Sequence, residues 1–164
     1  MSNFDLIVIG AGPAGYVAAI RAAQLGMKTA LIEKHTSLGG TCLNVGCIPS
    51  KALLDSSEKF ELAQHHFGEH GITVSDVKAD IPTMVKRKQG VVDKMTQGIN
   101  FLMKKNKVTV INGWATLSGP NSVKVDDKDE YQAKNILIAA GSDVIELPFA
   151  KFDGEHIISS TEAL

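Results

Sequence analysis

Residues 4–15 read Phe4-Asp5-Leu6-Ile7-Val8-Ile9-Gly10-Ala11-Gly12-Pro13-Ala14-Gly15, and this stretch decides the fold class. The apolar run Phe4–Ile9 stops at a glycine, which is typical of a buried parallel strand. The Ala-rich segment Pro13–Leu25 follows and also ends at a glycine, which predicts a helix. A second apolar run, Lys28–Ile32, predicts another strand. Together the three segments form a βαβ unit of about 30 residues.

The turn between the first strand and the helix has the spacing of a dinucleotide-binding fingerprint. Gly10 permits the tight turn, Gly12 lets the backbone approach a pyrophosphate, and Gly15 lets the helix pack closely on the strand. The N–H groups and positive dipole end of the helix favour phosphate. Glu33, which closes the second strand, can bond a free ribose hydroxyl. A glycine-rich turn without a ligand is the alternative, and this motif alone does not separate NAD from FAD.

Both cysteines of the chain lie in one run, Gly39-Gly40-Thr41-Cys42-Leu43-Asn44-Val45-Gly46-Cys47-Ile48-Pro49-Ser50-Lys51. In a regular helix, residues five apart have Cα atoms about 8–9 Å apart, whereas a disulfide needs less than about 7 Å. A Cys42–Cys47 pair therefore requires a distorted helix. Pro49 and Gly46 supply the means, because proline lacks a backbone donor and glycine lowers helix propensity.

Lys51 follows Cys47 by one helical turn, so that its ammonium can stabilise a thiolate and lower its pKa. Two inert buried thiols and a solvated lysine are the plainer alternative. The glycine entry and the nucleotide motif favour a redox pair.

The rest of the chain predicts one helix from Thr41 to about Gln64, a loop over Phe67–Val77, and a long helix from Ile81 to about Lys105 capped by Asp80. Four short apolar runs follow, at 108–111, 115–117, 122–125 and 135–140. We interpret the first three as an antiparallel excursion and the last as a return to the parallel sheet. The expected fold class is α/β, Rossmann-like, with helices and an antiparallel excursion.

Bulk properties exclude several functions. The chain has 164 residues and a net charge of −1, so it lacks the basic field that nucleic acids or anionic membranes attract. No apolar run approaches the ~20 residues of a membrane span. Two cysteines without a secretory signal indicate a reducing cytoplasm. His65, His66 and His70 are interpreted as an exposed polar loop, so no metal site is predicted.

The two motifs together resemble the flavoprotein disulfide reductases (pyridine nucleotide–disulfide oxidoreductases), and within them the dihydrolipoamide dehydrogenase branch. The resemblance covers nearly all of the chain and includes residues 5–16, Ala22-Ala23-Gln24-Leu25-Gly26, Glu33-Lys34 and the cysteine run. Ile48-Pro49-Ser50-Lys51 is similar to the lipoamide branch, whereas glutathione and mercuric reductases usually differ there.

The resemblance implies a bound FAD and a role for each matched residue. Cys42 would be the interchange thiol that meets the lipoyl sulfur, and Cys47 the charge-transfer thiol against the flavin. Ala140 departs from the family pattern, which usually has Thr there, and so loses a hydroxyl. The implied cofactor-binding residues are Gly10, Gly12, Pro13, Ala14, Gly15, Glu33, Lys34, Gly39, Gly40, Thr41, Lys51, Gly113, Ala140, Gly141 and Ser142.

The implied reaction oxidises dihydrolipoamide, with electrons passing through the cysteines and FAD to NAD. Family members run to roughly three times this length, so residues 1–164 are expected to be the N-terminal part of the FAD-binding domain, with NAD and C-terminal interface domains absent. Implied partners are the lipoyl groups of 2-oxoacid dehydrogenase complexes or the glycine cleavage system, and a second copy in a homodimer. A non-catalytic FAD-binding fragment and a reductase of another branch are the alternatives.

Two further expectations follow from the partial length. An FAD-binding domain of this kind is completed by a later stretch of chain, so we expect an incomplete sheet with exposed apolar edges. The chain begins close to the first strand, which favours a bacterial cytoplasm over a processed mitochondrial matrix protein.

Overall fold

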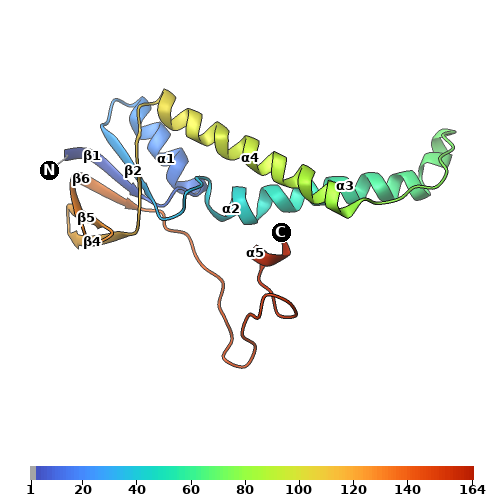
Figure 1. Cartoon of the computed structure of the whole chain (residues 1–164). Helices are drawn as coiled ribbons and strands as arrows, with labels where there is room; N and C mark the ends of the chain where they lie inside the picture. The colour runs from blue at the N-terminus through green and yellow to red at the C-terminus, as the bar shows by residue number, and fades with distance from the viewer. Residues whose placement is uncertain (1–2) are drawn as a thin grey trace.

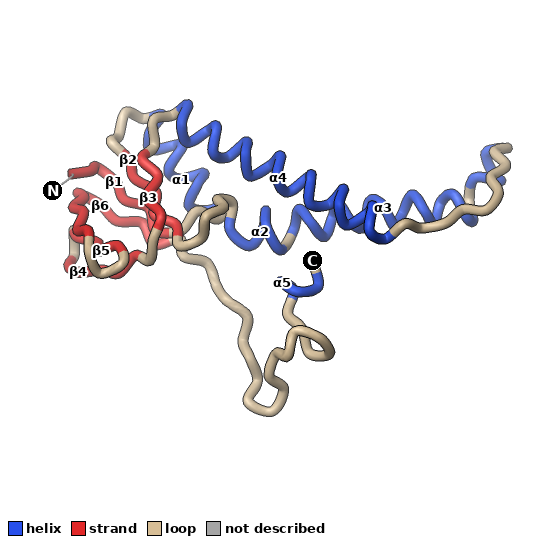
Figure 2. Tube along the Cα trace, viewed as in Figure 1, coloured by secondary structure: helices blue, strands red, loops and turns tan. Residues whose placement is uncertain are grey.

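The computed structural model describes residues 3–164 and confirms the α/β class. Six strands form one sheet in the order β3-β2-β1-β6-β5-β4, with the helices gathered on one side of it (Figure 1). Strand and helix regions separate clearly along the molecule, and an extended segment leads away from the sheet (Figure 2).

Four strands make the parallel part of the sheet. They are β1 (Asn3–Ile9), β2 (Thr29–Glu33), β3 (Thr109–Asn112) and β6 (Asp129–Ile138). β1 is central and pairs with β2 on one side and with β6 on the other, so that Ile9 lies opposite both Ile32 and Ile138. Helix α1 (Pro13–Gln24) connects β1 to β2, as the βαβ prediction requires.

The antiparallel part is smaller than predicted. β4 (Ala115–Gly119) and β5 (Ser122–Val125) form a hairpin, and β5 pairs with the first residues of β6. The expectation that the run 108–111 belongs to this excursion is wrong, because β3 pairs in parallel with β2. A short apolar run does not show which strand it will pair with. Here the long helix α4 returns the chain beside β2, so β3 pairs with β2.

The two faces of the sheet carry separate cores. One core lies under α1, α2 and α4, and its buried members are Val8, Ala11, Ala19, Leu31, Leu38, Leu43, Ile99, Met103 and Val108. The other core includes β5 and contains Phe4, Ile7, Ala30, Ile32, Val123, Val125 and Ala133. The central strands bury side chains on both faces, as expected for a strand covered on both sides.

The predicted single helix from Thr41 to Gln64 is wrong. The structure has two helices, α2 (Gly40–Val45) and α3 (Cys47–His65), separated at Gly46. A 3-10 turn, η1 (Phe67–His70), leads from α3 into a loop. α4 (Ile81–Lys105) matches its predicted bounds.

α3 and α4 lie side by side as a hairpin that projects away from the sheet (Figure 1). The Arg87 guanidinium ties them together, because it donates 2.9 Å to the Ala52 carbonyl and 2.6 Å to the Asp55 carboxylate. At the start of α4, the Asp80 carboxylate accepts a 3.1 Å bond from the Thr83 N–H, as the predicted cap requires.

The chain after β6 is extended and carries the predicted apolar exposure. Ile145 is 84 % exposed and Phe149 is 86 % exposed. The segment ends in the short helix α5 (Ser160–Ala163), which lies near the α3–α4 hairpin (Figure 2). There the Lys88 ammonium donates a hydrogen bond to the Leu164 carbonyl. No helix within residues 3–164 combines the length and apolarity that a membrane crossing requires.

Candidate functional site

The residues predicted to bind a dinucleotide converge at one edge of the sheet. Gly10 follows β1, Glu33 ends β2, Gly113 follows β3, and Ala140 comes shortly after β6. These four strands are parallel, so their carboxyl ends meet at the same edge. Ligands of open α/β sheets bind at this edge.

The glycine-rich turn is packed as the fingerprint predicts. Gly10 has φ +99°, and a Cβ on it would lie 2.3 Å from the Ala139 carbonyl oxygen. A Cβ on Gly15 would lie 1.7 Å from the Gly10 oxygen, so α1 could not pack this closely on β1. At Gly12, by contrast, the nearest atom to a Cβ is 3.9 Å away. The protein itself leaves room there, which fits a bound pyrophosphate.

A second glycine turn supports the first. The Gly39 N–H donates a 2.8 Å hydrogen bond to the Ala11 carbonyl. Gly40 has φ +58°, and a Cβ on it would lie only 2.6 Å from the Gly12 Cα. Thr41 is exposed on the first turn of α2. The entry to the cysteine run is therefore in direct contact with the nucleotide fingerprint, a contact that sequence spacing did not show.

Glu33 has a structural role besides the predicted one. Its side chain is 6 % exposed, and its carboxylate accepts hydrogen bonds from the N–H groups of Ala11, at 2.7 Å, and His35, at 3.0 Å. Each carboxylate oxygen can accept a further bond, so a ribose hydroxyl still has acceptor sites there. Ala11 is a residue that the sequence reasoning missed, because a backbone donor leaves no signal in residue type.

The two cysteines lie on either side of the helix break. Gly46 adopts φ −148° and ψ −118°, which ends α2 and starts α3. The Ser50 hydroxyl donates a 2.7 Å hydrogen bond to the Gly46 carbonyl, and Pro49, in the first turn of α3, is fully buried. The predicted distortion between Cys42 and Cys47 is confirmed, although its centre is Gly46 and regular helix already begins at Cys47.

Both cysteines are free thiols in this structure, Cys42 half-buried and Cys47 exposed. A hydrogen bond with the Cys47 thiol raises the pKa of Cys42, and burial raises it further. The Lys51 charge acts in the opposite direction on the pKa of Cys42, but it is the weakest influence. When both cysteines are reduced, therefore, the Cys47 thiol affects the pKa of Cys42 more strongly than Lys51 does.

The turns beyond β2 and β3 are tied to each other. The Gly113 N–H donates 2.9 Å to the Glu33 carbonyl, and the Asn112 amide donates 3.0 Å to the His35 carbonyl. Gly113 has φ +145°, and a Cβ would lie 2.4 Å from Val125 Cγ1. Packing alone thus requires glycine at position 113, and its N–H is already bonded within the protein.

Sequence reasoning also missed Trp114, the only tryptophan of the chain. The Lys34 ammonium lies 5.1 Å from the centroid of a Trp114 ring. The position of Trp114 directly after Gly113 was the sequence feature that could have pointed to it. Ala140, Gly141 and Ser142 are exposed just beyond β6, and Gly141 has φ +74°.

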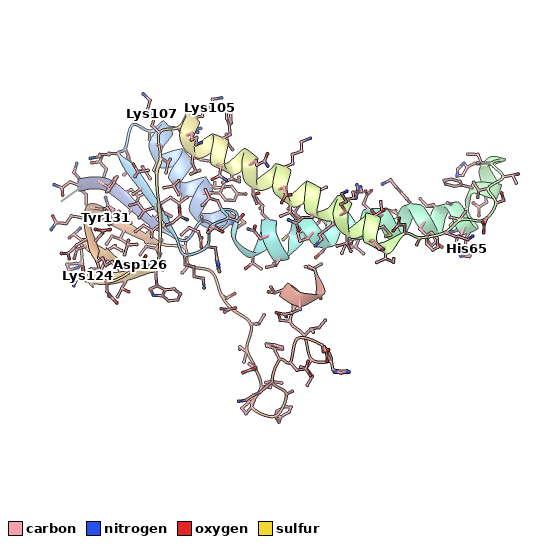
Figure 3. All side chains as sticks on the ribbon, viewed as in Figure 1. His65, Lys105, Lys107, Lys124, Asp126 and Tyr131 are labelled. Atoms are coloured by element: carbon pink, nitrogen blue, oxygen red, sulfur yellow. The ribbon has the colours of Figure 1, made fainter. Side chains whose placement is uncertain are left out.

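The histidine cluster lies far from this edge. Figure 3 shows His65 at the distant end of the helical hairpin, whereas Asp126 and Tyr131 lie at the sheet. His66 is 3.5 Å from the carboxylates of both Glu61 and Glu69. Within residues 3–164 no cluster of three or more His, Cys, Asp or Glu side chains is arranged to hold a metal ion.

A glycine-rich βαβ unit in contact with a dithiol is the arrangement expected of a dinucleotide-dependent thiol oxidoreductase. The family model described as pyridine nucleotide-disulphide oxidoreductase matches residues 4–164. The chain belongs to this family.

Curated relatives agree with this assignment. Dihydrolipoyl dehydrogenase 1, mitochondrial, from Arabidopsis thaliana is 52 % identical over 98 % of this chain and 32 % of its own length. Dihydrolipoyl dehydrogenase from Cupriavidus necator is 52 % identical over 99 % of this chain and 36 % of its own length. Leghemoglobin reductase from Glycine max is 51 % identical over 98 % and 31 %. The chain spans about a third of the length of these relatives.

Among solved structures, the HOCl-induced flavoprotein disulfide reductase RclA from Escherichia coli superposes with a TM-score of 0.70. Its sequence is 29 % identical, and the match covers 88 % of this chain and 29 % of that one. The fold described above is therefore shared with a flavoprotein disulfide reductase.

Proposed function

We propose that this chain is the FAD-binding, dithiol-bearing part of a dihydrolipoamide dehydrogenase. The observation that carries the proposal is the placement of Cys42 and Cys47 on either side of the Gly46 break, in a run whose glycine entry contacts the nucleotide fingerprint. The 52 % identity to dihydrolipoyl dehydrogenases supports the choice of branch.

The edge of the sheet at the carboxyl ends of the parallel strands would hold the cofactor. The space at Gly12 and the uncapped start of α1 suit a pyrophosphate, with Pro13, Ala14 and Gly15 in the first turn. Glu33 would accept from a ribose hydroxyl, and the remaining proposed contacts come from turns at the same edge. These are Gly10, Lys34, Gly39, Gly40, Thr41, Lys51, Gly113, Ala140, Gly141 and Ser142.

In the oxidised protein a Cys42–Cys47 disulfide would meet the dithiol substrate. One substrate thiolate attacks Cys42 Sγ, which breaks the Cys42–Cys47 bond and releases Cys47 as a thiolate. The second substrate thiolate then attacks the substrate sulfur of the mixed disulfide and releases Cys42. The substrate is thereby oxidised to its disulfide, and the protein is reduced by two electrons.

Two properties of the protein would stabilise the products of this exchange. The raised pKa of Cys42 favours its return as a neutral thiol, while the Lys51 ammonium would stabilise the Cys47 thiolate. A bound FAD supplies the ring that takes up the electron pair, and NAD, held by a region outside these residues, would be the final acceptor.

Partners and location follow from the same proposal. The substrate would be the lipoyl group carried by 2-oxoacid dehydrogenase complexes or the glycine cleavage system, and the whole enzyme would be a homodimer. The relatives include a Cupriavidus necator protein and mitochondrial plant proteins. We place this protein in a bacterial cytoplasm, with the mitochondrial matrix as the alternative.

Two other functions have specific support. The resemblance to RclA favours a disulfide reductase of another substrate branch. The chain has exposed apolar side chains after β6 and spans about a third of its relatives' length. Both observations favour a chain that binds FAD but has no catalytic activity by itself.

A substrate assay separates these functions. The whole protein should oxidise dihydrolipoamide with NAD and should not reduce glutathione disulfide or mercuric ion; the reverse preference would overturn the lipoamide assignment. Cys42→Ser should abolish dithiol turnover while flavin absorbance is kept, and retained turnover would refute the role of Cys42. Two-electron reduction of the FAD-loaded protein should produce a long-wavelength absorbance band that Cys47→Ser removes.

A further inference from the structure

The Asn44 side-chain amide bonds the segment that leads into α2 at three points. Its Nδ2 donates 2.9 Å to the Gly40 carbonyl and 3.2 Å to the Leu38 carbonyl. Its Oδ1 accepts a 2.8 Å hydrogen bond from the Ser37 hydroxyl. The amide thus acts as donor and acceptor at once, which a carboxylate of the same shape could not do.

The short helix α2 needs support from outside itself. It has only six residues, Gly40–Val45, and helices of this length are unstable in water on their own. Its first residue is a glycine, which is a poor helix former, and it lies between the sheet and the helical hairpin (Figure 1). The bond from Asn44 to Gly40 joins the end of α2 to its beginning. The other two Asn44 bonds fix the helix to the preceding segment.

The position of α2 decides where Cys42 lies relative to Cys47. Cys42 is on α2 and Cys47 begins α3, with the Gly46 break between the two helices. α3 is held by contacts of its own, since Pro49 is fully buried and Arg87 of α4 bonds its backbone. Loosening α2 would therefore displace Cys42 while Cys47 stays in place.

We propose that Asn44 is a positioning residue for the redox pair: by tying α2 to the segment Ser37–Gly40, it holds the Cys42 thiol against the Cys47 thiol. This inference rests on the proposed disulfide-exchange function and adds a residue that controls how readily the pair closes. The two thiols share a hydrogen bond in this structure, so they are already in contact. The same segment bonds the glycine-rich turn through the Gly39 N–H, so Asn44 also positions the pair relative to the edge where the cofactor would bind.

The first test measures how readily the pair closes. As Cys42 and Cys47 are oxidised to their disulfide, one oxidised glutathione is reduced to two thiols, so the glutathione ratio sets the disulfide fraction. In the whole protein, Asn44→Ala should lower the equilibrium constant for this disulfide about five- to ten-fold, the effect of losing hydrogen bonds that favour one arrangement. Peptide mass spectrometry after acid quenching measures the fraction.

The second test separates positioning from overall stability. The hydrogen bond with Cys47 raises the pKa of Cys42, so a displaced α2 should lower this pKa. The pH midpoint of Cys42 alkylation by iodoacetamide should therefore move down in Asn44→Ala, toward the value of Cys47→Ala. A lower free energy of unfolding does not by itself move the midpoint, because alkylation in native buffer reports on the folded protein.

Asn100→Ala is the matched control. The Asn100 Nδ2 donates 3.2 Å to the carbonyl of Thr96, four residues earlier on α4, just as Asn44 bonds Gly40. This variant loses the same kind of bond on another helix and should leave the equilibrium and the midpoint unchanged. Ser37→Ala removes only the bond to Oδ1, so it should shift both measurements in the direction of Asn44→Ala by a smaller amount.

The outcomes separate the inference from the proposed function. Shifts in both measurements for Asn44→Ala, with none for Asn100→Ala, support the positioning role. The role is refuted if either measurement is unchanged in Asn44→Ala, or if Asn100→Ala shifts them equally. If Asn44→Ala does not fold, Ser37→Ala decides in the same way. If the wild-type protein forms no Cys42–Cys47 disulfide in oxidised glutathione, the proposed function fails and the inference fails with it.

Discussion

The backbone N–H of Ala11 donates a 2.7 Å hydrogen bond to the buried carboxylate of Glu33. This bond joins the glycine-rich turn after β1 to the end of β2, and it makes the shape of the turn depend on an acid elsewhere in the chain. The carboxylate also accepts from the His35 N–H, so it organises both turns before any ligand is present.

Replacing Glu33 by Gln should therefore destabilise the fold itself. The amide NH2 cannot accept, so either the Ala11 N–H, whose bond is buried, or the His35 N–H, whose bond is part-buried, loses its partner. The expected loss in the free energy of unfolding is about 1–3 kcal/mol, measured by urea denaturation. Glu58→Gln on the exposed face of α3 is the control and should change stability little. Equal stability of both variants would show that the Glu33 bonds contribute nothing.

Gly40→Ala should push the two glycine turns apart. Its φ of +58° costs an alanine about 1–2 kcal/mol, and the new Cβ would collide with Gly12. Both the free energy of unfolding and FAD affinity should fall.

The matched change on α4, Gly90→Ala, meets no atom within 4 Å. It should raise the free energy of unfolding by roughly 0.5–1 kcal/mol, because alanine is the better helix former. A Gly40→Ala variant as stable as wild type would contradict the close contact with Gly12.

Gly46→Ala should separate the thiols. A Cβ at this position would lie 2.8 Å from the Thr41 carbonyl oxygen and 3.3 Å from the Cys42 Cα, so α2 must shift relative to α3. Oxidation of the reduced variant with diamide should form the Cys42–Cys47 disulfide more slowly than in wild type, as followed by thiol titration. Gly68→Ala, which has open space, is the control. Unchanged rates would mean that the break does not depend on glycine.

The pH dependence of the reduced protein should reveal the Cys42–Cys47 hydrogen bond. The folded state raises the pKa of Cys42, so it prefers the neutral thiol. Below the unfolded pKa of ~8.5 this stabilisation is fully present, and it is lost as the pH rises through the higher folded pKa.

Cys47→Ala removes the hydrogen bond and should move the midpoint of Cys42 alkylation by iodoacetamide to lower pH, as measured by peptide mass spectrometry. Cys47→Ala should also reduce the loss of stability at alkaline pH. A midpoint that stays in place or moves upward would show that burial, rather than the neighbouring thiol, controls Cys42.

Local sequence rules predicted much of the fold because the signals were local. The Phe4–Ile9 run, the glycine stops and the Asp80 cap each act within a few residues, and the corresponding elements agree with the structure to within a residue or two. The same rules failed where a partner was needed. The first half of β6, Asp129–Ala133, is mostly polar and was not predicted as a strand. It forms one because β5 and β1 lie beside it.

The sequence by itself determined the α/β class, the dinucleotide fingerprint and the need for a break between Cys42 and Cys47, because glycine, proline and apolar runs restrict the backbone wherever they occur. Only the tertiary structure decided that β3 joins the parallel sheet, that Gly40 touches Gly12, and that Trp114 lies beyond Glu33. These are contacts between segments far apart in the chain, and they depend on how α4 returns the chain to β2.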